Sequence, residues 1–141
     1  MDVVLSSVMC CCEAQDLFTL SGLCKETRSI FTSKSFWKAR FALLGIKHEE
    51  PSLQVYLRCL RLEDKFLDEG TGLLFYSEID LDVLCNTSSL IPKMGSYILS
   101  GYLVIEFREG KYNISNMKEP YLSGLSKEEA LNVLLKLCPR G

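Results

Sequence analysis

The stretch from Glu13 to Gly45 constrains this chain most, because it contains three short helical patterns in close succession. Helices this short are marginal alone in water, so they must pack on one another. Leu17, Leu20 and Cys24 are spaced three and four residues apart, as on one face of a helix. Ser33 is a suitable N-cap for the last helix. We expect one shared core made of these apolar residues: Leu17, Leu20, Cys24, Ile30, Phe31, Trp37 and Phe41.

A further helix is expected before this stretch, from about Asp2 to Cys12. Asp2 lies where a negative charge favours a helix N-terminus. The apolar residues recur at helical spacing and form one wide face: Val4, Leu5, Val8, Met9 and Cys12. We expect the second helix to cover part of this apolar face. The part of the face that stays uncovered is a predicted docking surface.

The same region resembles the F-box. The resemblance rests on a leucine-rich helix, a Cys-Lys step and a terminal aromatic-Trp pair, without a gap, at Asp16-Leu17, Leu20, Gly22-Leu23-Cys24-Lys25, Arg28, Ile30, Ser35 and Phe36-Trp37. It extends back to Met1 and covers roughly the first third of the chain. F-boxes usually open with Leu-Pro, whose proline would align with Met1, and the aromatic that often follows the Cys-Lys step is Thr27 here.

The resemblance implies a Skp-type adaptor of cullin–RING ubiquitin ligases as the partner. It implies a tether that raises the effective concentration of a target near a ligase and needs no catalytic residue of its own. The residues expected to bind the partner are Val4, Leu5, Val8, Leu17, Leu20, Lys25, Arg28 and Trp37. Small family members without repeat domains occur in large DNA viruses, where they redirect host degradation, so a viral source is one implication.

The basic stretch from Lys25 to Arg40 leaves a second function open. Its cations and interleaved aromatic residues could bind phosphates and stack on bases in a nucleic-acid-associated accessory protein. The cations are Lys25, Arg28, Lys34, Lys38 and Arg40. The aromatic residues fall at helix-core intervals, which favours a packed core with the cations on its solvated side. A third alternative is a homodimer or larger homo-oligomer that buries the N-terminal apolar face.

Composition limits the remaining classes. The chain has 141 residues, a mass of 16.0 kDa and a net charge of −2, which fits one domain or two small units without a general attraction to nucleic acid. No apolar run approaches the roughly 18 residues that span a bilayer. The first residues lack the basic region of a secretory signal. We therefore expect an intracellular protein of the cytoplasm or nucleus, in the host cell if the source is viral.

Catalytic and metal-binding patterns are weak in the sequence. The seven cysteines include three adjacent residues and no CxxC pair, which favours reduced thiols over a zinc site or a disulfide framework. His48 is the single histidine, so a cysteine nucleophile has few candidate bases. Gly-rich phosphate loops and the common hydrolase motifs do not occur. We expect a binding protein without enzymatic activity, metal or cofactor.

The second half predicts a small α+β unit. A long helix should start near Pro51 or Ser52, run to about Leu67 and join the two halves, since its apolar residues form two stripes. Strand patterns occur at residues 73–76, 97–99 and 102–107, and a short helix is expected at 78–85 before a loop at 86–94. A hairpin turn at 108–110 leads to a returning strand at 111–115. Ser126 and Glu129 form the capping box of a terminal helix.

These patterns together predict an α+β fold. Residues 1–48 are expected to form the F-box-like helical bundle, residues 49–69 the connecting helix, and residues 70–141 the small α+β unit. In that unit a β-hairpin or small antiparallel sheet should be covered by the terminal helix, because a small sheet is only marginally stable without a cover.

Overall fold

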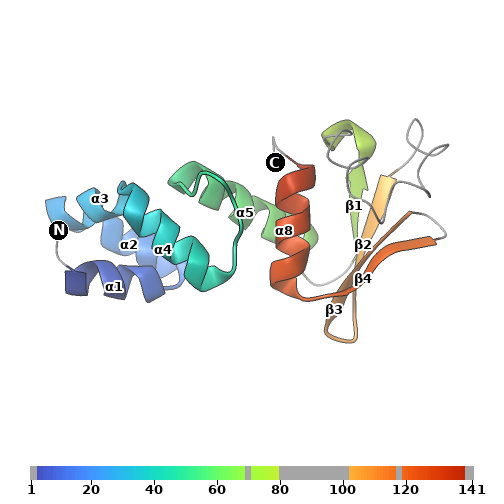
Figure 1. Ribbon diagram of the computed structural model, residues 1–141, viewed down its shortest axis with the longest axis horizontal. Coiled ribbons are helices and arrows are strands. Elements are labelled where there is room, and N and C mark those ends of the chain that lie inside the picture. Colours follow the sequence, from blue (N-terminus) through green and yellow to red (C-terminus); the bar gives the residue numbers. More distant parts are fainter. Residues whose placement is uncertain (1–2, 69–70, 80–101, 117–118, 139–141) are drawn as a thin grey trace. The chain divides into compact units, whose positions relative to one another are not determined.

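The computed structural model describes residues 3–68, 71–79, 102–116 and 119–138, and all structural statements below concern these residues (Figure 1). The chain divides into two compact units, Met1–Leu57 and Arg58–Gly141. The fold is α+β, as expected: N-terminal helices, a four-stranded antiparallel sheet and a C-terminal helix that packs on the sheet.

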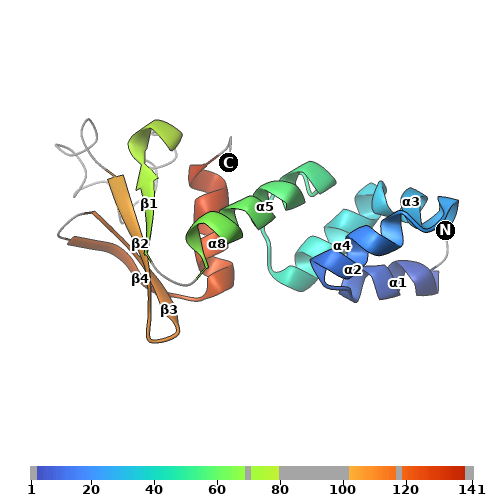
Figure 2. The same cartoon turned by 180° about the vertical axis from the view of Figure 1, so that it is seen from behind.

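The first unit is a helical bundle. Its helices are α1 (Val3–Cys11), α2 (Ala14–Ser21), α3 (Lys25–Phe31) and α4 (Lys34–Leu44). The predicted helix near the N-terminus and the three short helices after it are thus confirmed. Helices α1 and α4 lie side by side (Figure 1 and Figure 2). The most buried side chains come from all four helices and form one core: Met9, Leu17, Ile30, Phe36, Trp37 and Phe41.

Two details of the predicted bundle core were wrong or incomplete. Cys24 is exposed, because α2 ends at Ser21 and Cys24 is the extended N-cap of α3. There its backbone amide donates to the Thr27 hydroxyl over 3.2 Å. Leu20 and Phe31 are only half-buried. Ser33 is the N-cap of α4 as predicted, although its hydroxyl contacts Ser35 and not the helix amides.

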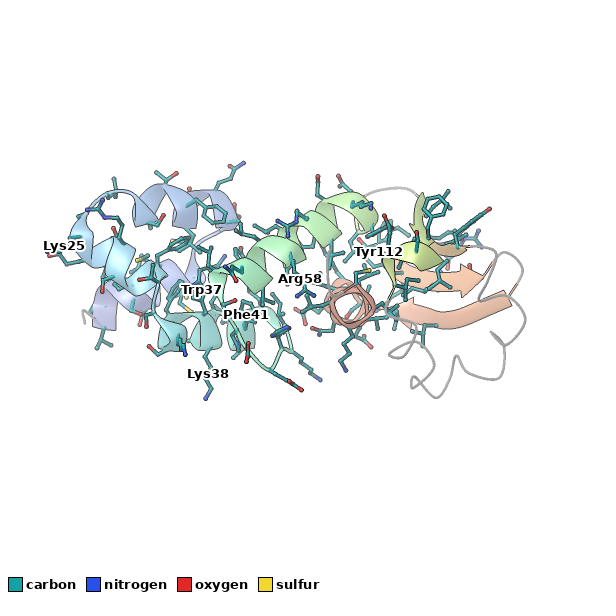
Figure 3. The ribbon with its side chains drawn as sticks, turned by 90° about the horizontal axis from the view of Figure 1, so that it is seen from above. Lys25, Trp37, Lys38, Phe41, Arg58 and Tyr112 are labelled. Carbon is teal, nitrogen blue, oxygen red and sulfur yellow. The ribbon has the colours of Figure 1, made fainter. Side chains whose placement is uncertain are left out.

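The long helix α5 (Leu53–Phe66) begins at the predicted place. The hydroxyl of Ser52 accepts a hydrogen bond from the Val55 amide over 3.2 Å and so caps the first turn. The boundary between the two compact units falls inside this helix. In the first unit Tyr56 packs against Trp37, with ring centroids 5.2 Å apart. In the second unit Arg58 donates to backbone carbonyls of the terminal helix, toward which Figure 3 shows it pointing.

The second unit is built on one antiparallel sheet in the order β1-β2-β3-β4. Its strands are β1 (Thr71–Phe75), β2 (Tyr102–Arg108), β3 (Lys111–Asn116) and β4 (Glu119–Leu125), and the short 3₁₀ helix η1 (Tyr76–Glu78) follows β1. In the register, Leu74 faces Leu103 and Ile105 faces Ile114, and all four side chains are buried. Helix α8 (Lys127–Leu137) packs on β3 and β4, as predicted for the terminal helix (Figure 1).

The turns of this unit follow the sequence signals in part. Gly110 has a φ of 77°, the positive value predicted for the hairpin glycine, and Glu109 also has a positive φ of 55°. The side chains of Ser126 and Glu129 form the predicted capping box at the start of α8. Strand β4 was not predicted. Its pairing with β3 shifts register, which disrupts the alternation that identifies a strand.

The strand pattern expected at residues 73–76 corresponds to β1 and the first residue of η1. Most of the short helix expected at 78–85, the loop at 86–94 and the strand at 97–99 lie outside the described residues.

Candidate partner-binding site

Helix α1 turns an apolar side to solvent. The exposed fraction is 76% for Val3, 74% for Val4 and 52% for Val8, whereas Met9 is completely buried. Val4 and Val8 are four residues apart and therefore share one face of the helix. Leu5 is half-buried. The first unit covers one side of α1 and leaves a valine face, Val3, Val4 and Val8, exposed.

The C-terminus of α1 is held by a buried arginine, Arg40, which was expected on the solvated side of the bundle. Arg40 of α4 is 2% exposed, and its Nη1 donates to the backbone carbonyls of Cys10 over 2.9 Å and of Cys12 over 2.7 Å. Its Nη2 donates to the Tyr56 hydroxyl over 2.8 Å. The unsatisfied carbonyls at the end of a helix carry partial negative charge, which a guanidinium complements.

An aromatic cluster forms the centre of the bundle. Trp37 is 2% exposed, and its Nε1 donates to the backbone carbonyl of Phe31 over 2.6 Å. The Trp37 ring lies 5.0 Å from the Phe36 ring and 5.2 Å from the Tyr56 ring, between centroids. Because the indole is enclosed and its N–H is satisfied, Trp37 fixes how the helices pack.

The predicted partner-binding residues therefore fall into three groups. Exposed side chains belong to Val4, Val8, Lys25 and Arg28, and half-buried ones to Leu5 and Leu20. Leu17 and Trp37 lie in the bundle core, with 0% and 2% exposure. The exposed valines of α1 can meet a partner directly, whereas Leu17 and Trp37 support the helices from inside. That these residues bind a partner stays a prediction.

Four of the five cations of the basic stretch are exposed, and the fifth is buried. Lys25 and Lys38 point away from the bundle (Figure 3), and Arg28 and Lys34 are also exposed. Arg40 was expected on the solvated side and is buried, because the α1 carbonyls bind its guanidinium. The aromatic rings of this stretch are enclosed in the core or half-buried: Phe31, Phe36, Trp37 and Phe41. Stacking on nucleic-acid bases would require them to leave the core.

The thiols of the described residues are free. Burial raises the pKa of the Cys59 thiol and of the Cys138 thiol from 9.0 to about 11, so both are protonated at neutral pH. His48 accepts a hydrogen bond from the Glu50 amide at its Nδ1, over 2.9 Å. Within the described part of the chain, no three histidine, cysteine or acidic residues are grouped to hold a metal ion.

None of the helices in the described ranges combines the length and the apolar character that a membrane crossing requires.

The helices that carry the valine face coincide with a known domain. The model of the F-box domain matches residues 2–39, from the start of α1 into α4. No curated protein and no solved structure matches the chain. F-box proteins are adaptors without catalysis of their own, which is the class expected from the sequence, and the domain implies binding of a Skp-type protein. Residues 2–39 of this chain are an F-box domain.

Proposed function

We propose that this protein tethers a target to a Skp–cullin ubiquitin ligase, with a Skp-type adaptor docked on α1 and the target held by the second unit. The observation that carries the proposal is the valine face of α1, which lies inside the F-box domain and is exposed at Val3, Val4 and Val8. Fully burying one valine side chain contributes about 1.5–3 kcal/mol. Covering this face would therefore give a partner a substantial share of its binding free energy.

The second unit provides the target-binding part of the proposal. Leu73 and Phe75 of β1 alternate with the buried Leu74, so they lie on the face of the sheet opposite α8. They are 44% and 49% exposed, and the Phe75 ring contacts Tyr102 of the next strand, with centroids 5.9 Å apart. We also propose that the chain consists functionally of an F-box-like helical unit at residues 1–48, a connecting helix at residues 49–69 and a small α+β unit at residues 70–141.

For the location in the cell we propose only a broad assignment. F-box proteins are intracellular, and we assign this protein to the cytoplasm or nucleus. The comparisons give no support to a viral source.

The test is a titration of the full chain with a purified Skp-type adaptor, at low and high salt. We expect a one-to-one complex whose affinity changes little with salt, because an apolar interface releases few counterions. Failure to bind would contradict the proposal. A parallel titration with single-stranded nucleic acid should show no specific binding, and a steep salt dependence there would instead support the accessory-protein alternative.

A mass measurement of the free protein completes the experiment. We expect a monomer, because the proposed partner of the valine face is the adaptor and not a second copy of this chain. A dimer that dissociates when Val4 and Val8 are replaced would show that this face serves self-association and would overturn the docking proposal.

A further inference from the structure

We propose that Arg40 is the positioning residue of α1, whose guanidinium holds the C-terminus of that helix and thereby orders its valine face. The effect on α1 stands on the geometry alone. Its consequence for adaptor binding rests on the proposed function.

The contacts of Arg40 join three separate parts of the first unit. Its Nη1 lies 2.9 Å from the carbonyl oxygen of Cys10, 2.7 Å from that of Cys12 and 3.5 Å from that of Met9. Its Nη2 donates to Tyr56 of α5, and the guanidinium carbon lies 5.0 Å from the centroid of the Tyr56 ring. One side chain thus connects the end of α1 with α4 and the start of α5.

These contacts offset the free-energy cost of burying the positive charge of Arg40 almost completely. Burying a charge is costly unless it is paired or hydrogen-bonded. The compensation comes from the negative end of the α1 dipole and from the π face of Tyr56. The Nε of Arg40 is buried and has no hydrogen-bond partner among the described residues. Among the described residues, the guanidinium therefore donates to the end of α1, to Cys12 just after it, and to Tyr56.

Helix α1 needs such an attachment because its own sequence supports it weakly. It has nine residues, VVLSSVMCC, and contains valine, serine and cysteine, which are poorer helix formers than alanine or leucine. Its exposed valines bury little surface within the chain. Met9 is its one fully buried side chain. Removing the Arg40 contacts should therefore loosen α1 before it loosens the rest of the bundle.

The Arg40 contacts extend beyond the part of the chain that matches the F-box domain. The matched region ends at residue 39, and both Arg40 and Tyr56 follow it. A fragment limited to the matched residues would contain α1 without the side chains that hold its C-terminus.

The test compares amide hydrogen exchange in the full-length protein and in Arg40→Met, measured without any partner. We expect the amides of residues 7–12 to exchange at least about tenfold faster in the variant, the factor that corresponds to losing one hydrogen bond to a charged group. Amides of α8 should keep their wild-type rates, and those of α2 and α3 should change less than those of α1. Lys38→Met, which replaces an exposed cation of the same helix, is the matched control and should leave all rates unchanged.

Two milder variants keep the test decisive if Arg40→Met does not fold. Arg40→Lys retains the charge but cannot contact the carbonyls and Tyr56 together, so it should restore part of the α1 protection. Tyr56→Phe removes only the hydroxyl acceptor and should also speed exchange at residues 7–12, by a smaller factor. Equal acceleration throughout the bundle, or unchanged α1 amides, would overturn the proposal.

Adaptor affinity provides the second readout. In the variants that fold, adaptor affinity should decrease as the exchange rate of the α1 amides increases. Arg40→Met should therefore bind the adaptor more weakly than Arg40→Lys. If α1 loosens while affinity stays constant, the link from Arg40 to docking is wrong. If wild-type protein does not bind the adaptor at all, the proposed function fails while the exchange result still decides the role of Arg40.

Discussion

At the scale of a single residue, Trp37 belongs to the F-box pattern but lies inside the bundle and not on its surface. The indole is 2% exposed and hydrogen-bonded to the Phe31 carbonyl, so Trp37→Ala should lower the free energy of unfolding by about 3–5 kcal/mol. Equilibrium urea denaturation measures this change. Lys38→Ala on the exposed side of the same helix should change it by less than about 0.5 kcal/mol. Unaltered stability of Trp37→Ala together with lost adaptor binding would instead identify the ring as an interface anchor.

The buried thiols give a second residue-scale prediction. Burial raises the pKa of the Cys59 and Cys138 thiols to about 11, so at pH 8 both should react with iodoacetamide far more slowly than the exposed Cys11. Mass spectrometry of peptides after timed labelling measures the order. Labelling of Cys59 before Cys11 in the native protein would contradict the burial.

The same shifts set a direction for stability with pH. In the unfolded chain these thiols ionise near 9.0 and in the folded protein near 11. Between these values the folded state binds more protons, so stability should fall as the pH rises through this window. Cys138→Ala should show a smaller fall than wild type over the same range, because it lacks one of the two groups. If stability falls equally in Cys138→Ala and in wild type, other residues cause the pH dependence.

Sequence patterns identified most residues of the bundle core but misplaced Cys24 and Arg40. Spacing put Cys24 on the face of Leu17, yet α2 ends at Ser21, and a helix end is poorly defined by periodicity alone. Arg40 fell between aromatic residues and was assigned to solvent. Its partners are carbonyls about thirty residues earlier in the chain, and carbonyls belong to every residue type, so sequence carries no sign of them.

At the scale of elements, helices with caps were predicted better than strands. Ser126 and Glu129 identified the start of α8, because a capping box is a local signal. Strand β4 was missed because it contains Pro120 and Gly124, residues that are depleted in strands, and its register shifts against β3. Its stability depends on pairing with β3, for example through the Gly124 amide and the Asn113 side chain 3.0 Å away.

The β2–β3 turn offers an element-scale prediction. Both of its central residues have positive φ, 55° at Glu109 and 77° at Gly110, which is the geometry that favours Asn-Gly. Glu109→Asn should therefore raise the free energy of unfolding by up to about 1 kcal/mol, seen as a higher melting temperature. Glu109→Ala should give no such gain. Loss of stability in Glu109→Asn would show that the turn differs from this description.

At the scale of the whole molecule, the chain consists of two compact units. The first unit contains the F-box domain and the open valine face, and the second contains the sheet covered by α8. The sequence predicted the class of both units, since helical and strand patterns occur in separate halves of the chain. It could not predict which apolar residues stay exposed, because Val4 and Met9 belong to the same predicted face and only packing distinguishes them.

The most direct test is the affinity of a Skp-type adaptor for the double variant Val4→Glu, Val8→Glu, measured by calorimetry on the full chain. Leu17→Asp is unsuitable because Leu17 is fully buried and its loss would unfold the bundle. Leu73→Glu, which places one carboxylate at a 44% exposed residue of the second unit, is the control. We predict that the double variant keeps the wild-type melting temperature and binds at least about a hundredfold more weakly, while Leu73→Glu binds like wild type. Wild-type affinity in the folded double variant would contradict the account.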